Sequence, residues 1–204
     1  MEPRPADVTA VILAGGRSTR FGGDKALATW RGRPLVDHVL DRLPSERAGA
    51  VLVVRKEQAQ DHRVRGRLTL VHDDPALHEG PLRGVIRGLA ACRTPWAWVV
   101  ACDQPLVSPA LLLALRRTAA AADLAVIPAW GGRLHPLTGL YAVQCGPLLQ
   151  ECSAGGETSL VGALKKIGFR VFEEDDCRLW DRRGAGFLNI NRPGQLALLE
   201  GDEP

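Results

Sequence analysis

Residues 11–30, "VILAGGRSTRFGGDKALATW", join an apolar run to a turn that is rich in glycine and positive charge. The apolar run at 8–14 is continuous rather than alternating, which is typical of a strand covered on both faces of a parallel sheet. In an open α/β sheet, ligands bind just beyond the carboxyl ends of the strands. This stretch therefore predicts a first strand that ends at a ligand site.

The residues that follow this strand favour an anion as the ligand. Gly15 and Gly16 have no Cβ, so their backbone N–H groups can approach a ligand closely and form a concave anion site. Arg17, Arg20 and Lys25 add positive charge within the next nine positions, and guanidinium and ammonium groups both bind phosphate oxygens. We expect a polyphosphate here.

Two well-known phosphate loops do not match this turn. The P-loop requires a lysine followed by serine or threonine, whereas Lys25 is followed by Ala26. The G-x-G-x-x-G pattern of dinucleotide sites is also missing after the strand, so no dinucleotide cofactor is expected.

The rest of the chain alternates apolar runs with helical patterns. Further strands are expected at 50–54, 68–72, 96–102 and 124–129, and helices at 34–43, 82–92 and 109–121. Ser108 is a good N-cap before Pro109. A strand at 137–143, a helix at 158–167, an edge strand at 169–173 and a helix at 193–201 complete the pattern. This alternation predicts an α/β sheet with helices on both faces.

Length and composition fit one globular domain over residues 1–204, of which residues 1–7 are expected to form a flexible N-terminal extension. A net charge of +3 is too small to favour nucleic acid or a membrane surface as a partner. The five cysteines have no metal-ligand spacing, and their odd number fits reduced thiols. The polar N-terminus does not resemble a signal peptide, so we expect a cytoplasmic protein.

Two aspartates follow expected strands. Asp103 ends the run at 96–102, and Asp73 ends the run at 68–72. A carboxylate at the end of a central strand faces the ligand crevice, and Mg²⁺ in phosphate chemistry is usually held by one or two carboxylates together with substrate phosphates. Asp103 could instead cap the next turn through its side chain, and Asp74 could be the turn residue before Pro75.

Five motifs in order resemble those of the MobA-like nucleotidyltransferases, a family that contains the molybdenum cofactor guanylyltransferases. They are L-A-G-G-x-S-x-R-F-G-x-D-K-A at 13–26, "HEGPLRGVIRGL" at 78–89, "ACDQP" at 101–105, "HPLTGLY" at 135–141 and "FLNINRP" at 187–193. The resemblance runs along nearly the whole chain. It implies a Rossmann-like three-layer α/β sandwich with a mostly parallel sheet, of the nucleotide-diphospho-sugar transferase type.

The resemblance also implies a reaction: transfer of GMP from GTP to the terminal phosphate of the molybdopterin cofactor, with release of pyrophosphate and with Mg²⁺ held by Asp103. It assigns catalysis to Arg20, Lys25 and Asp103. It assigns nucleotide binding to Leu13, Ala14, Gly15, Gly16, Lys25, Asp73 and Asp103. It further implies transient contact with molybdoenzymes or cofactor-handling proteins.

Asn189 and Asn191 flank Ile190 and face the same way if this segment is extended. On spacing alone they fit a turn before Pro193 equally well. The resemblance favours a role at the second substrate.

Two departures from the family pattern affect substrate contacts. Val54 stands near the position where some members place an asparagine after the second strand. Thr158 and Ser159 stand where some members carry arginines that meet the second substrate, and Arg170, Arg133 and Arg192 are candidate substitutes.

Three other functions fit parts of the pattern. A molybdenum cofactor cytidylyltransferase tends to carry L-A-A-G rather than the L-A-G-G found here. Sugar-phosphate and phospholactate nucleotidyltransferases share the glycine turn. A nucleotide-binding adaptor in cofactor insertion would be non-catalytic, and the presence of both Lys25 and Asp103 argues against it.

Overall fold

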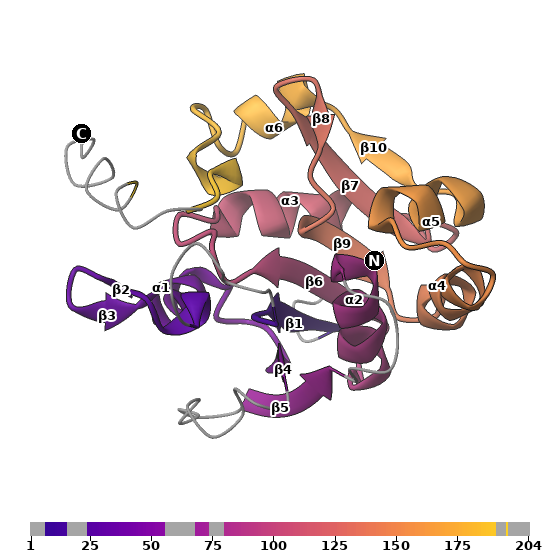
Figure 1. Ribbon diagram of the computed structural model, residues 1–204. Coiled ribbons are helices and arrows are strands. Elements are labelled where there is room, and N and C mark those ends of the chain that lie inside the picture. Colours follow the sequence, from indigo (N-terminus) through magenta and orange to yellow (C-terminus); the bar gives the residue numbers. More distant parts are fainter. Residues whose placement is uncertain (1–6, 16–23, 56–67, 74–79, 191–194, 196–204) are drawn as a thin grey trace.

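A computed structural model describes residues 7–15, 24–55, 68–73, 80–190 and 195. Its centre is a sheet with the strand order β10-β7-β9-β6-β1-β4-β5, to which the short β8 adds by pairing with β7 (Figure 1). The strands are β1 (Val8–Leu13), β4 (Gly49–Arg55), β5 (Leu68–Asp73), β6 (Trp96–Ala101), β7 (Ala125–Trp130), β8 (Arg133–Leu134), β9 (Thr138–Ala142) and β10 (Arg170–Phe172).

The sheet is mostly parallel, and strands that come later in the chain are added on both sides of β1. β1 pairs in parallel with both β4 and β6, β4 pairs in parallel with β5, and β10 pairs in parallel with β7. β9 runs antiparallel to its neighbours β6 and β7. Because β4 and β5 lie on one side of β1 and β6 lies on the other, the topological switch point falls between β1 and β6. In open α/β sheets this is where a ligand crevice forms.

Helices cover both faces of the sheet and make the three layers expected from the sequence. They are α1 (Leu35–Arg42), α2 (Pro81–Ala90), α3 (Pro109–Thr118), α4 (Cys145–Ala154), α5 (Leu160–Ile167) and the short α6 (Glu174–Arg178). Alternate side chains of β1 enter different cores. Ile12 packs in the core that contains Val36 of α1 and Leu111 of α3, whereas Val11 packs in the core that contains Leu89 of α2 and Leu164 of α5.

Helix α2 lies unusually close to β1. A Cβ on Gly84 would lie 3.3 Å from the Leu13 side chain, and a Cβ on Gly88 would lie 2.2 Å from Val11 Cγ1. Only glycine permits that approach. Since Gly84 packs on the end of β1 and Gly88 on its middle, the helix runs back along the strand and begins at the carboxyl edge of the sheet.

The strands expected at 8–14, 50–54, 68–72, 96–102, 124–129, 137–143 and 169–173 are all present, and β10 does lie at a sheet edge. Ser108 caps α3 as expected, because its side chain accepts a hydrogen bond from Leu111 N. The helix expected at 193–201 lies outside the described residues except for Gln195. Within the described part of the chain, no helix is both long and apolar enough to cross a membrane.

A two-stranded hairpin, β2 (Thr29–Trp30) and β3 (Arg33–Pro34), was not predicted. Its two-residue turn places Arg31 at φ 50° and Gly32 at φ 71°. Two positive φ angles in succession are what a type I′ turn requires. The hairpin continues into α1 and contributes Trp30 to a small apolar cluster with Leu35 and Ile190.

Candidate functional site

The end of β1 is held between the ends of its two neighbouring strands. Leu13 pairs with Ala101 in β6, and the carbonyl of Leu13 accepts a hydrogen bond of 3.0 Å from Cys102 N. On the other side, Ala14 N donates to Val53 O in β4 at 2.8 Å. Three residues of the predicted nucleotide site, Leu13, Ala14 and Gly15, therefore lie at the switch point of the sheet.

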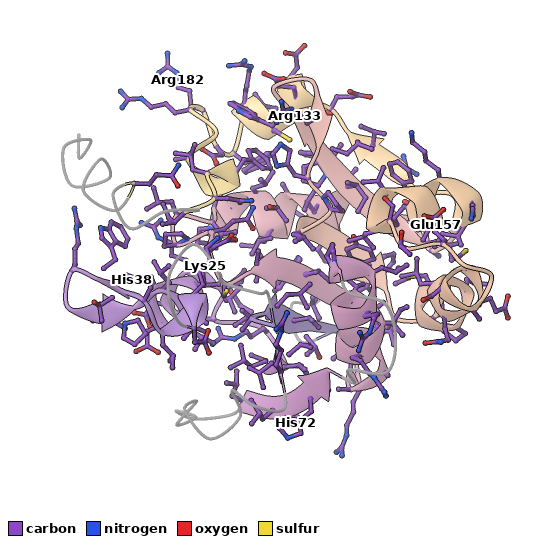
Figure 2. The ribbon with its side chains drawn as sticks, viewed as in Figure 1. Lys25, His38, His72, Arg133, Glu157 and Arg182 are labelled. Carbon is purple, nitrogen blue, oxygen red and sulfur yellow. The ribbon has the colours of Figure 1, made fainter. Side chains whose placement is uncertain are left out.

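Lys25 and Asp103 meet at this edge although they are 78 residues apart. Lys25 Nζ lies 2.5 Å from Asp103 Oδ2, and each side chain is 15% exposed. Figure 2 shows Lys25 beside the end of β6. Lys25 begins a single 3₁₀ turn, which Asp24 caps by accepting a hydrogen bond of 2.9 Å from Ala26 N. The two residues with the strongest predicted catalytic roles are thus in direct contact.

The second oxygen of Asp103 fits a cation. Oδ1 is buried, and no hydrogen-bond partner for it is found among the described residues. The next residue, Gln104, anchors the loop by donating from Nε2 to Thr138 Oγ1 at 2.9 Å. An anchored carboxylate with an unused lone pair suits Mg²⁺. Within the described segments there is no group of three or more His, Cys, Asp or Glu side chains that could hold a metal, so a metal here needs further ligands from a substrate.

Arg55, the last residue of β4, is a member of the site that the sequence did not reveal. Its Nε donates a hydrogen bond of 2.6 Å to the carbonyl of Gly15. Val54, near the position where an asparagine occurs in some family members, is fully buried in the core. The guanidinium of the following residue therefore supports the glycine turn instead.

The beginning of α2 adds positive potential to the same edge. Gly80 precedes this helix with φ 139°, Pro81 is its first residue, and Arg83 in its first turn is 7% exposed. The unsatisfied N–H groups at a helix N-terminus carry a partial positive charge and favour anions. Together with Lys25 and Arg55, this end of α2 makes the edge suited to a polyphosphate.

Of the two expected second-substrate residues, Asn189 lies beside the Asp103 loop. Ile190 N donates a hydrogen bond of 2.9 Å to the carbonyl of Asp103, and the Ile190 side chain is buried against Trp30 and Leu35. This hydrogen bond holds the backbone of the preceding residue, Asn189, next to the Asp103 loop. Asn191 lies outside the described residues.

Arg170, a candidate substitute for the family's arginines, and Ser159, which stands at one of their positions, both have structural partners. Arg170 lies on the edge strand β10 and donates two hydrogen bonds to the carboxylate of Asp123, so it does not replace the family's arginines at the site. Ser159 caps α5 by accepting from Gly162 N. Arg133 lies on β8, away from Lys25 (Figure 2).

Several predicted site residues lie outside the described part of the chain. They are Gly16, Arg17, Arg20 and Arg192, together with the side chain of Asp73, whose backbone ends β5.

Neither the thiol nor the imidazole close to this edge is suited to act as a base. Burial and the neighbouring Asp103 charge raise the pKa of the Cys102 thiol well above its usual value, so it stays protonated. Burial and the charge of Arg133 lower the pKa of His135, although its ring nitrogen bonds to the Trp130 carbonyl at 3.2 Å. The ring also packs against Phe187, with centroids 4.6 Å apart. Both side chains are structural in this arrangement.

Comparison with known proteins agrees with this geometry. The family model of the MobA-like NTP transferase domain matches residues 10–167. The chain belongs to the MobA-like NTP transferase family. The matched range includes Lys25, Arg55, α2 and Asp103, and it ends before the segment that carries Asn189.

A relative from Pseudomonas putida, named molybdenum cofactor guanylyltransferase, is 38% identical over 187 residues, which is 91% of this chain and 94% of the relative. The crystal structure of molybdopterin-guanine dinucleotide biosynthesis protein A from Archaeoglobus fulgidus matches with a TM-score of 0.80 at 25% identity, over 95% of this chain and 97% of that chain. A 2-C-methyl-D-erythritol 4-phosphate cytidylyltransferase from Thermus thermophilus has the same fold, with a TM-score of 0.68 at 17% identity over 94% and 97% of the two chains.

Proposed function

We propose that this member of the MobA-like NTP transferase family is a molybdenum cofactor guanylyltransferase. It transfers GMP from GTP to the terminal phosphate of the molybdopterin cofactor and releases pyrophosphate. The observation that carries this function is the contact between Lys25 and Asp103 at the switch point of the sheet, because it joins a phosphate-binding cation to a metal-binding carboxylate. The names of the guanylyltransferase relatives indicate the two substrates.

The carboxyl edge accommodates the triphosphate of GTP. The glycine-rich segment that begins at Gly15 is proposed to offer backbone N–H groups to the phosphates, and the Arg55 hydrogen bond holds the Gly15 carbonyl. Lys25 and the first turn of α2 supply positive charge from two other directions. Catalysis in such a site consists of positioning and of electrostatic stabilisation of charge on the leaving group.

Asp103 is the residue that would hold Mg²⁺, through the oxygen that Lys25 does not use. When bound, the metal neutralises charge on the triphosphate and on the departing pyrophosphate. Gln104 holds the Asp103 loop in position through its hydrogen bond to Thr138.

The reaction needs no base from the protein. The nucleophile is an oxygen of the molybdopterin terminal phosphate, whose second pKa is about 6, so it is mostly dianionic at neutral pH. It forms a bond to the α-phosphorus of GTP, and the bond from that phosphorus to the bridging oxygen breaks. The protonated thiol of Cys102 and the low imidazole pKa of His135 agree with chemistry that uses no acid–base pair.

Asn189 is proposed to meet the second substrate. The bond between Ile190 N and the Asp103 carbonyl ties this asparagine to the metal-binding loop, so the acceptor phosphate and the nucleotide can lie on opposite sides of Asp103.

Five free cysteines, three of them buried, fit a reducing cytoplasm, where the product would pass to molybdoenzymes or cofactor-handling proteins in transient contacts.

The rival with the same fold is a cytidylyltransferase. The Thermus thermophilus structure shows that the fold itself accepts either type of enzyme. We propose guanine because of the L-A-G-G sequence at 13–16 and because of the relatives' activity. A site that pairs the polar edge of one base rejects another base strongly, since its own groups would be left without partners.

The test is a comparison of GTP, CTP and ATP with Mg²⁺, by thermal shift and by pyrophosphate release in the presence of molybdopterin cofactor. A nucleotide at about 100 times its dissociation constant stabilises the folded state by about 2.7 kcal/mol. Of the three nucleotides, only GTP is expected to stabilise the protein and to give product. Equal turnover with CTP would assign the chain to the cytidylyltransferases, and binding without turnover would favour the adaptor.

A further inference from the structure

The ion pair of Lys25 and Asp103 brings a cation of the protein itself to the carboxylate that would hold the metal. Lys25 Nζ lies 2.5 Å from Oδ2, and each side chain is only 15% exposed. A Mg²⁺ ligand oxygen lies about 2.0–2.1 Å from the ion. Two cations on one carboxylate would then lie a few ångströms apart with little water between them, and they would repel each other strongly.

The free oxygen of Asp103 does not remove this conflict. Oδ1 is buried and has no partner among the described residues, so it is available to a metal in terms of geometry. Its negative charge, however, is shared across the carboxylate and is already balanced by Lys25. A divalent ion that arrived alone would have to give up several waters for one neutralised carboxylate, and Mg²⁺ gives up its waters reluctantly.

A triphosphate changes the balance of charge. It offers Lys25 a second set of anionic oxygens, and the four-carbon lysine side chain is flexible enough to change partners without moving the backbone. Once Lys25 has turned to the phosphates, Asp103 is left as an uncompensated, largely buried carboxylate, which is costly unless a cation replaces the ammonium.

We propose that Lys25 determines when a metal binds: in the nucleotide-free protein it is the counter-ion of Asp103, and the metal enters only together with the nucleotide. This role rests on the proposed function, because it assumes that Asp103 is the metal ligand and that the nucleotide carries a polyphosphate. It is separate from the contribution of Lys25 to turnover, since it concerns the protein before any substrate is bound.

The experiment measures Mn²⁺ binding to the nucleotide-free protein by electron paramagnetic resonance. Wild type is expected to bind Mn²⁺ weakly at Asp103. Lys25→Met keeps the length of the side chain without its charge, and it is expected to bind Mn²⁺ at least tenfold more tightly. Lys25→Gln, which can still donate a hydrogen bond to the carboxylate, is a second neutral variant and should show the same direction of change.

The controls separate this effect from a general change in charge. Lys166→Met also removes one ammonium, from an ion pair with Glu157 in which Lys166 Nζ and Glu157 Oε2 are 3.0 Å apart, and should leave Mn²⁺ affinity unchanged. In the double variant Lys25→Met with Asp103→Asn, the gain in Mn²⁺ affinity should disappear, because the ligand is gone. Circular dichroism melting shows that each variant is folded.

An unchanged or weaker Mn²⁺ affinity in folded Lys25→Met and Lys25→Gln would overturn the inference. A gain that survives Asp103→Asn would also overturn it, because the metal would then bind elsewhere. Failure of the proposed function has a different signature: wild type would not be stabilised by GTP with Mg²⁺ or would use CTP equally well, whatever the Mn²⁺ affinity of the variants.

Discussion

Two ion pairs lie at opposite ends of the central strands, and they differ in what they leave unused. At the amino edge, Arg116 donates from Nε to Asp7 Oδ1 at 3.2 Å and from Nη2 to Asp7 Oδ2 at 2.6 Å. The same guanidinium lies 5.0 Å above the ring of Trp96. Both carboxylate oxygens of Asp7 accept a hydrogen bond from Arg116, so neither oxygen is left without a partner.

At the carboxyl edge, Lys25 occupies one oxygen of Asp103 and leaves the other buried without a partner among the described residues. Both pairs are largely buried, with exposures of 14% and 26% for Arg116 and Asp7 and 15% for both members of the other pair. Burial alone therefore does not identify the functional pair. The Lys25–Asp103 pair, proposed to be functional, differs in having an acceptor without a partner among the described residues, and the two pairs should respond differently to mutation.

The largest effect is expected from Asp103→Asn. Asparagine keeps the shape of the side chain but removes the charge that balances Lys25 and would hold Mg²⁺. We expect turnover to fall by about 100-fold or more, as when one preorganised electrostatic group is removed from an active site. Calorimetry with Mg²⁺ and with chelator should show that the metal dependence of GTP affinity becomes much weaker.

If Asp103 only caps a turn, the Asp103→Asn substitution would leave turnover nearly unchanged, because asparagine caps turns as well as aspartate does. Near wild-type turnover would therefore contradict the role given to Asp103 and would make Asp73 the next candidate for the metal ligand.

The sequence identified Lys25 in the basic cluster of the glycine-rich turn and Asp103 after an apolar run, but it did not reveal their contact. Residues 78 positions apart meet only because β1 and β6 are neighbours, and neighbour order in a parallel sheet is a tertiary property. The resemblance to a known family supplied what periodicity could not.

Arg55 could not be predicted for a different reason. It supports the site through a backbone carbonyl 40 residues earlier in the chain, and a carbonyl has no residue type that a motif could reveal. A positive charge directly after a buried strand was the one available signal.

The fold was more predictable than the site, because long apolar runs mark buried strands. The elements that were missed have weak patterns. The hairpin strands β2 and β3 have two residues each. Helix α4 begins with Cys-Gly-Pro, three residues that are poor or neutral helix formers, and tertiary packing of Cys145 and Leu149 in the core overrides that preference.

An intermediate effect is expected from Arg55→Ala, which removes the charged hydrogen bond to the Gly15 carbonyl. Hydrogen bonds to charged groups contribute about 1.5–3 kcal/mol, so calorimetry should show GTP binding weakened about tenfold. The matched control is Arg47→Ala. Arg47 also donates to backbone carbonyls, those of Leu43 and Pro44, but it lies outside the site. A similar loss of GTP affinity in both variants would show that Arg55 has no particular connection with the nucleotide.

The amino-edge pair should affect stability without affecting function. Asp7→Asn leaves Arg116 partly buried with a neutral partner, which should lower the free energy of unfolding by about 1–2 kcal/mol. For a chain of this length the melting temperature should fall by about 3–6 °C. GTP affinity should stay within about twofold of wild type. A larger change in affinity would mean that the two ends of the sheet are coupled, and the contrast between the pairs would then be wrong.

The smallest effect is expected at Arg170, which lies exposed on the edge strand β10 and pairs with Asp123. Burial raises the pKa of Asp123, but hydrogen bonds from Arg170 and from Ala120 N outweigh it and hold the pKa below its ordinary value. A carboxyl with a lowered pKa stabilises the folded state above its unfolded pKa, which is about 3.9, and this contribution is lost as the pH falls through the folded value. Arg170→Ala should therefore lower the melting temperature by about 1–2 °C at pH 7, and the difference from wild type should shrink as the pH falls from 4 towards 3. Added salt should also reduce it, because exposed pairs are screened. Melting curves of both proteins between pH 3 and 7 measure this directly, and a difference that grew at low pH would contradict the assignment of Asp123 as the titrating partner.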